Sequence, residues 1–90
     1  MKKAIITVVG KNSFGIIAKV STKLAEEKID VLDISQTIVQ GYFNMMMIVD
    51  FDACEKSISE VSTELDAIGQ ELGVQIKCQL EDIFDKMHRI

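Results

Sequence analysis

The most informative stretch of this 90-residue chain is residues 31–51, VLDISQTIVQGYFNMMMIVDF. Apolar and polar side chains alternate through residues 31–39, which is typical of a half-buried β-strand. Gly41 can turn the chain, because glycine adopts backbone angles that other residues avoid. Residues 43–51 then predict a second strand. Because no helix separates the two strands, we expect a β-hairpin.

Two further strands are predicted near the ends of the chain. Residues 4–9 are mostly β-branched and apolar at nearly every position, so we expect a strand buried on both faces in the middle of a sheet. Residues 74–80 place apolar side chains at even positions and polar side chains at odd positions. This alternation predicts the last strand.

Two amphipathic helices are predicted between the strands. The first ends at about Lys28, after apolar side chains that recur three and four residues apart. Asp52 with Glu55 resembles a capping box at the start of the second helix, and Gly73 ends that helix. Residues 81–90 can form a short terminal helix.

The predicted order of elements is therefore βαββαβ, followed by a C-terminal tail. Right-handed crossovers place both helices on one face of a four-stranded antiparallel sheet, so we expect an α+β protein with the ferredoxin-like arrangement. We expect one domain over residues 1–90, with a core of about residues 3–80 and a helical tail at 81–90. Because this arrangement carries many unrelated functions, function has to be inferred from individual residues.

Size and charge limit the classes of function. Ten Lys and Arg residues against 14 Asp and Glu give a net charge of -4, and the basic residues are scattered. We therefore expect no direct binding of nucleic acid. The longest apolar run, residues 45–49, is far shorter than the roughly 18 residues of a membrane-spanning helix, and with no signal peptide we expect a cytoplasmic protein. A chain of this length buries only about 60% of its unfolded surface, which favours stabilisation by association.

Residues that could carry catalysis or hold a metal are scarce. The single histidine, His88, and the single arginine, Arg89, lie together in the tail, so the sequence brings no nucleophile, base and oxyanion donor together. Cys54 and Cys78 lack the spacing of a metal site or redox motif, and we expect both to be reduced core thiols. We therefore expect no catalytic residue, no metal and no cofactor.

Residues 44–49 carry apolar side chains on both faces of a strand, although the helices can cover only one face of the sheet. We expect the other face to pack against a second subunit, with an interface that includes Ser35, Thr37, Met46 and Ile48. The alternatives are a partly exposed methionine patch and cover by the C-terminal tail, since methionine adapts to either environment.

Residues 10–15, GKNSFG, form a polar loop bracketed by glycines directly before a predicted helix. Free backbone N–H groups and the helix dipole at such a place favour a carboxylate or another anion. Glycines at turns also serve purely steric purposes, so both interpretations stay open.

Several of these segments together resemble the ACT domain, over roughly residues 3–80. The resemblance is carried by VGK at 9–11, GIIAKV at 15–20, LAEEKIDV at 24–31, LDISQT at 32–37 and DIFDKMHRI at 82–90. The chain is most similar to standalone single-domain ACT proteins of bacteria and archaea, and to the ACT repeats of the glycine-cleavage transcriptional repressor.

The resemblance implies a regulatory module, not a catalyst, that binds an amino acid or a similar small molecule. In the family the ligand lies at a subunit interface, between the loop after the first strand and the second strand of a neighbour. Members that bind amino acids use Asn or Asp, two further residues and then Gly, a pattern that Asn12 and Gly15 match, with Ile16 supplying a helix-start N–H. A second family anchor, Asn followed by an aliphatic residue, maps to Asp30 and Val31.

Three positions depart from the family pattern. Phe14 stands where proline is usual, Ser13 where Arg or Lys is common, and Asp30 where Asn is usual. Phe14 removes rigidity from the loop and adds an apolar lid, while the charge of Asp30 attracts an α-amino group and repels a carboxylate. We therefore expect the ligand's carboxylate near the amides of residues 12–16 and its amino group near Asp30.

The leading hypothesis is a homodimeric or higher homo-oligomeric sensor of a small molecule that signals to another protein chain. The alternative is a ligand-free interaction module that uses the same sheet surface to bind a partner protein. An enzyme with an unrecognised site ranks last.

Overall fold

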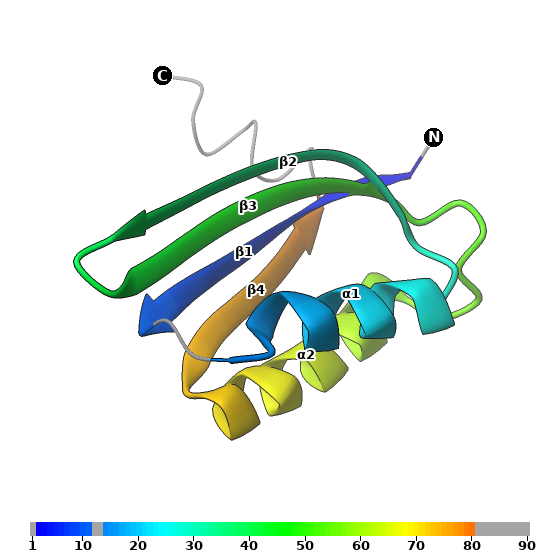
Figure 1. The fold of residues 1–90 in the computed structure, drawn as a ribbon. Helices are drawn as coiled ribbons and strands as arrows, with labels where there is room; N and C mark the ends of the chain where they lie inside the picture. The colour runs from blue at the N-terminus through cyan, green and yellow to red at the C-terminus, as the bar shows by residue number, and fades with distance from the viewer. Residues whose placement is uncertain (1, 12–13, 81–90) are drawn as a thin grey trace, which may run out of the picture.

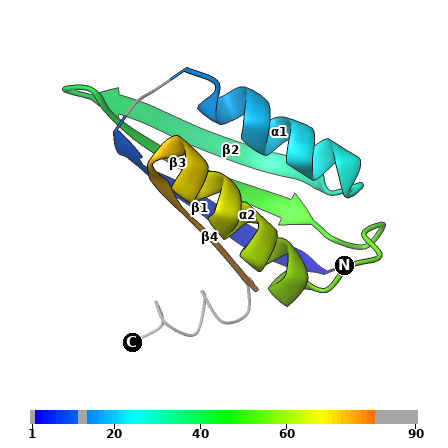
Figure 2. The ribbon, with the colours of Figure 1, turned by 90° about the horizontal axis from the view of Figure 1, so that it is seen from below.

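A computed structural model of the chain describes residues 2–11 and 14–80. Its elements are β1 (Lys3–Lys11), α1 (Ile16–Glu26), β2 (Asp30–Val39), β3 (Tyr42–Asp50), α2 (Ile58–Leu72) and β4 (Val74–Leu80). The strands form one antiparallel sheet in the order β2-β3-β1-β4, and both helices lie on the same face of it (Figures 1 and 2). The predicted ferredoxin-like arrangement is confirmed, and the predicted tail helix lies outside the described residues.

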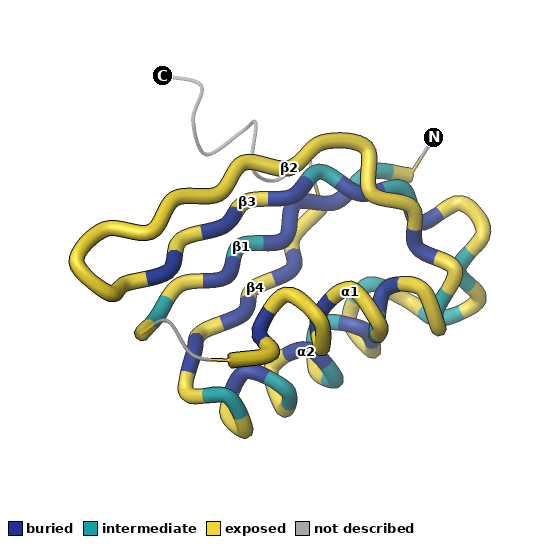
Figure 3. The backbone as a smooth tube through the Cα atoms, in the orientation of Figure 1, coloured by how far each residue is buried: buried dark blue, intermediate teal, exposed yellow. Residues whose placement is uncertain are grey.

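The core lies between the sheet and the two helices. Strand β3 alternates as its sequence predicts, and its helix-facing side chains, Phe43, Met45, Met47 and Val49, are all buried. The helices contribute Ile16, Val20 and Leu24 from α1 and Val61 and Leu65 from α2. Figure 3 shows this burial along the inner strands and on the inward sides of both helices.

The second helix begins later than the sequence predicted. Its N-cap is Ser57, whose hydroxyl oxygen accepts a hydrogen bond from the Glu60 N–H at 3.1 Å. The predicted capping box of Asp52 with Glu55 is therefore wrong. The Asp52 carboxylate is engaged elsewhere, because it accepts a bond from the Lys2 N–H at 2.7 Å. The predicted end at Gly73 is confirmed. Neither helix in the described part of the chain is long and apolar enough to cross a membrane.

The turn between β2 and β3 fixes the register of the hairpin. Gln40 and Gly41 both have positive φ angles, 51° and 81°, which defines a two-residue turn of type I′. Val39 pairs directly with Tyr42 across it. The hairpin end of the sheet projects beyond both helices (Figures 1 and 2).

Strand β2 is not half-buried as its alternation predicted. All ten of its residues are exposed (Figure 3). They include Ile34 and Ile38, which the pairing with β3 places on the helix-facing side. The reason is its position at the sheet edge, where one long side has no neighbouring strand. The pairing register shifts between Val31 and Asp33, so Leu32 sits in a bulge and leaves the regular alternation.

Strand β1 is buried on both faces over only part of its length. Ile5 is buried on the face away from the helices, but Val9, on the same face, is 48% exposed. The prediction of burial on both faces is therefore wrong at the Val9 end of the strand, where the helices cover one face and no described element covers the other.

Candidate ligand-binding site

Among the described residues, the first backbone donors of α1 have no hydrogen-bond partner. Gly15 is the N-cap in a left-handed conformation, with φ 84°, and as glycine it has no side-chain oxygen to cap the helix. The first intrahelical bond runs from the Lys19 N–H to the Gly15 carbonyl at 2.9 Å, so the N–H groups of residues 16–18 have no partner within the helix. No acidic residue lies in the first turn. The helix start can therefore accept the negative charge of a ligand.

Apolar side chains flank these donors. Phe14 is fully exposed, at 102%, and Ile17 is partly exposed. Neither side chain is needed to fill the core of a single chain, which distinguishes them from the buried Ile16 beside them. A ligand with an apolar side chain could bury surface against Phe14 and Ile17.

Asp30 and Val31 lie at the opposite end of the chain's own sheet. Asp30 pairs with Asp50 of β3, whereas Lys11, at the end of β1 that leads to α1, pairs with Tyr42. Tyr42 and Asp50 are eight residues apart, so at about 3.4 Å per residue the two ends are separated by about 27 Å. One chain therefore does not bring Asp30 to the start of α1, and a ligand that touches both needs two copies.

The predicted loop residues are only partly described. Asn12 and Ser13 lie outside the described residues, so the structure gives no placement for either. Phe14, Gly15 and Ile16 lie together at the helix start, as the sequence predicted.

The predicted interface residues share one face of the sheet. Ser35 pairs with Met46 and Thr37 with Asn44, while Ile48 pairs with Ile5 of β1 on the same side. This is the face away from the helices. Met46 is 40% exposed and Ile48 is half-buried, so apolar side chains extend over β3 on that face.

The sequence analysis did not predict that apolar residues would be exposed at two further places. Val9 adds to the open face beside β3, and Ile34 with Ile38 lines the helix-facing side of β2. The apolar alternation of residues 31–39 contained the second group, but it could not show that no helix covers the edge strand.

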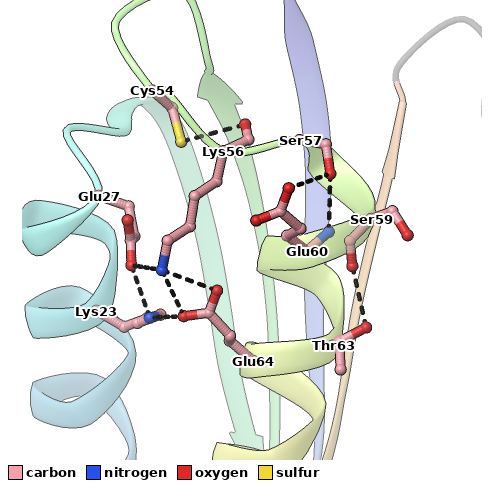
Figure 4. Close-up of polar contacts among 9 residues, drawn as sticks. All are labelled: Lys23, Glu27, Cys54, Lys56, Ser57, Ser59, Glu60, Thr63 and Glu64. Atoms are coloured by element: carbon pink, nitrogen blue, oxygen red, sulfur yellow. Dashed lines mark hydrogen bonds and ion pairs between the residues drawn. The ribbon is translucent and has the colours of Figure 1, made fainter.

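A cluster of four charged residues joins α1 to α2 (Figure 4). Lys23 donates hydrogen bonds to Glu27 and Glu64, and Lys56 Nζ donates to Glu27 at 2.9 Å and to Glu64 at 2.9 and 3.0 Å. These hydrogen bonds raise the pKa of each lysine and lower the pKa of each glutamate. Because the two positive and two negative charges compensate one another, we interpret the cluster as structural, holding α1 and α2 in position relative to each other.

A shallow hollow of about 410 Å³ lies on the outer side, between α1 and α2. The Lys19–Glu71 ion pair, 2.6 Å long, spans the two helices there. Ala18 is the one lining residue from the first turn of α1, and Phe14, Gly15 and Ile17 do not line the hollow, so the hollow adjoins the candidate site without containing it.

Comparison with known proteins identifies the family. A family model described as an ACT domain matches residues 2–79. A UPF0237 protein of Bifidobacterium longum is 56% identical over 90 residues, which cover 100% of both chains. The solved structure of an ACT domain protein from Streptococcus pneumoniae has 46% sequence identity and a TM-score of 0.80, over 92% of this chain and 93% of that one.

A more distant likeness agrees in fold. A solved structure described as a glycine cleavage system transcriptional repressor is 20% identical with a TM-score of 0.75, and the match covers 88% of this chain and 45% of that one. The resemblance predicted from the sequence is confirmed, and the chain belongs to the ACT domain family.

Proposed function

We propose that the protein is a regulatory module that binds an amino acid or a similar small ligand between two copies of the chain and signals its occupancy to a partner protein. ACT domains are typically regulatory domains that bind small ligands. The observation that carries the proposal is the start of α1, where Gly15 supplies no side-chain cap, beside the exposed Phe14. The family resemblance implies a ligand at this position.

The start of α1 and the Asp30 side chain have the opposite charge preferences that a zwitterion needs. The N–H groups at the start of α1 and the positive end of its dipole attract a carboxylate. At the other end of the sheet, Asp30 pairs with Asp50, so two acidic residues face each other across β2 and β3. An ammonium group placed near Asp30 relieves that like-charge contact. An α-amino acid carries both groups within a few ångströms.

Assembly provides the regulatory signal. Asp30 follows the far end of α1, whose 11 residues span about 16 Å, so a ligand of amino-acid size that touches both the helix start and an Asp30 side chain binds only to associated chains. Such a ligand shifts the equilibrium toward the assembled state by its difference in affinity between the states. A partner protein that recognises the assembled surface then responds to the ligand.

Thermal denaturation with each common amino acid tests the proposal. A ligand at 100 times its dissociation constant stabilises the fold by about 2.7 kcal/mol, which raises the midpoint of a domain of this size by roughly 10 °C or more. We expect one amino acid, or a related pair, to raise the midpoint. The same response should be lost in Asp30→Ala and kept in the control Asp33→Ala, which removes the same charge from the same strand.

A ligand-free interaction module is the second candidate. The exposed apolar side chains of Val9 and Met46 on the open face favour it, since that surface can bind a protein without a small molecule. No thermal shift with any amino acid, combined with stable assembly, would support this candidate over the sensor.

A further inference from the structure

Burial on the open face of the sheet, the face away from the helices, decreases from one end to the other. At one end Ile5 is only 6% exposed, and Ile48, its partner on β3, is half-buried. Further along the same two strands, Met46 is 40% exposed and Val9 is 48% exposed. Both strands have a neighbouring strand on each side over this length, so strand pairing does not explain the difference. The difference indicates a cover over the Ile5 end of the face.

No helix or strand in the described part of the chain supplies this cover. Both helices lie on the opposite face, and the four strands form the sheet itself (Figure 2). The remaining residues are 1, 12–13 and 81–90. Residues 12–13 follow Lys11, at the far end of β1 from the covered face, and residue 1 is a single position. Residues 81–90 are therefore the one remaining segment long enough to cover both Ile5 and Ile48.

The chain leaves β4 beside the covered end of the face. Leu80, the last residue of β4, pairs with Ala4, and Gln79 pairs with Ile5. A segment that folds back from Leu80 over the open face therefore meets Ile5 first. Neighbouring strands lie about 4.8 Å apart, so the three spacings from β4 to β2 amount to about 14 Å. A helix over residues 82–90 is about 13 Å long, which suffices to cross the sheet.

The sequence of the segment, EDIFDKMHRI at 81–90, has the pattern of a helix with one apolar side. Its apolar residues, Ile83, Phe84, Met87 and Ile90, recur at the spacing that gathers side chains on one side of an α-helix. All the other residues are charged or histidine. Such a helix gains stability when its apolar side packs against an apolar surface, and the open face offers one at Ile5 and Ile48.

The order of charges along the segment matches the order of charges across the sheet. Acidic residues come first in the segment and basic residues come last: Glu81, Asp82 and Asp85, then Lys86 and Arg89. On the open face around Ile5, lysines lie on the β4 side and aspartates lie on the β2 side: Lys77 of β4 and Lys3 of β1, then Asp50 of β3 and Asp33 of β2. A segment that crosses from β4 toward β2 therefore places opposite charges near each other at both of its ends.

We propose that residues 81–90 fold back as a short helix across the open face of their own chain and cover Ile5 and Ile48. The sheet is then covered on both faces at this end, by α1 and α2 on one side and by the C-terminal segment on the other. Ile48 in this arrangement contacts the segment and not a second subunit. Val9 and Met46 lie beyond the segment and stay available to a protein partner. The inference goes beyond the proposed function, since it uses neither the start of α1 nor Asp30.

Nuclear Overhauser effects (NOEs) in the parent chain test the contact directly. We expect NOEs from the Phe84 ring to the methyl groups of Ile5 and Ile48, and none from that ring to Val9. A mixture of isotope-labelled and unlabelled chains distinguishes contacts within one chain from contacts between two. The expected NOEs should be missing from the filtered spectrum that reports only contacts between chains. If they appear there, a second copy supplies the cover and the proposal is overturned, and their absence from both spectra would overturn it as well.

Thiol labelling measures the cover independently. Ile48→Cys places a thiol under the proposed segment, and the matched control Val9→Cys places one on the same face beyond it. Adding Phe84→Ser removes the largest apolar side chain of the segment. We expect this change to raise the labelling rate at position 48 about tenfold, which corresponds to about 1.4 kcal/mol, and to leave the rate at position 9 unchanged. Peptide mapping separates both positions from Cys54 and Cys78.

Two labelling results would contradict the cover. An unchanged rate at position 48 after Phe84→Ser would show that the segment does not shield Ile48. Equal increases at positions 48 and 9 would show a general loosening of the fold and not the release of a local cover. Far-UV circular dichroism that matches the parent shows that each variant keeps the sheet and both helices.

Discussion

Gly69 lies in the last turn of α2, where the helix packs against β4. It is buried, and a Cβ atom added to it would lie 2.7 Å from the Val74 carbonyl oxygen and 3.2 Å from Ile76 Cγ1. The helix cannot move away freely, because Gly73 alone separates its end from β4. Gly69→Ala is therefore a sharp test of the packing between α2 and β4.

Two effects of opposite sign decide the result. Helix propensity alone predicts that Gly69→Ala stabilises the fold by about 1 kcal/mol. Overpacking a well-filled contact costs about 1–3 kcal/mol, and here the nearest atom is a backbone oxygen, which yields less easily than the end of a side chain. We expect the contact to win, with a net loss of up to about 2 kcal/mol. Each kcal/mol of loss lowers the melting temperature by about 4–8 °C.

The assay is thermal denaturation followed by circular dichroism. All variants are measured at one protein concentration, since the midpoint of any protein that associates depends on concentration. The control is Ala67→Gly in the same helix, where the exposed side chain is lost and propensity alone predicts a loss of about 1 kcal/mol. A melting temperature that rises in Gly69→Ala would refute the packing argument and leave propensity as the dominant effect.

Three further predictions follow from the caps, charges and thiols. Ser57→Ala should lower the free energy of unfolding in urea by about 1 kcal/mol, with an unchanged m-value, because it removes the cap of α2. Hydrogen bonds from two lysines lower the pKa values of Glu27 and Glu64 from 4.5. The stability that these carboxylates contribute is therefore complete above pH 4.5 and is lost as the pH falls through their folded pKa values. In urea titrations at a series of acid pH values, the free energy of unfolding of Glu64→Gln should fall less steeply with decreasing pH than that of the parent. Burial raises the pKa of the Cys78 thiol to about 11, so Cys54, which is half-buried, should react first with a thiol reagent in the native protein.

The architecture could be predicted because its signals are local. Residues 74–80 form β4 as their alternation predicted, and Gly73 ends α2 because its φ of 77° suits glycine. The hairpin followed from Gly41 and the absence of an intervening helix. The predicted start of α2 was wrong because Asp52 and Ser57 both resemble N-caps in the sequence. Only the long-range hydrogen bond from the Lys2 N–H shows that the Asp52 carboxylate is engaged elsewhere.

The candidate site could be predicted only in part, because its residues lie far apart in one chain. The start of α1 at Gly15 and Ile16 was found from the glycine-bracketed loop and the family resemblance. The separation of Asp30 from that loop could not be found, since it depends on the register of β3 with both of its neighbours.

The wrong prediction for β2 is itself informative. Alternation in a strand indicates that one face is buried, and residues 31–39 alternate, yet Ile34 and Ile38 are about half exposed in the folded chain. The apolar face of β2 therefore exceeds what the fold of one chain requires. The alternation therefore marks the two faces of β2, one of which continues the helix-facing side of β3, and it does not require that either face is buried within one chain.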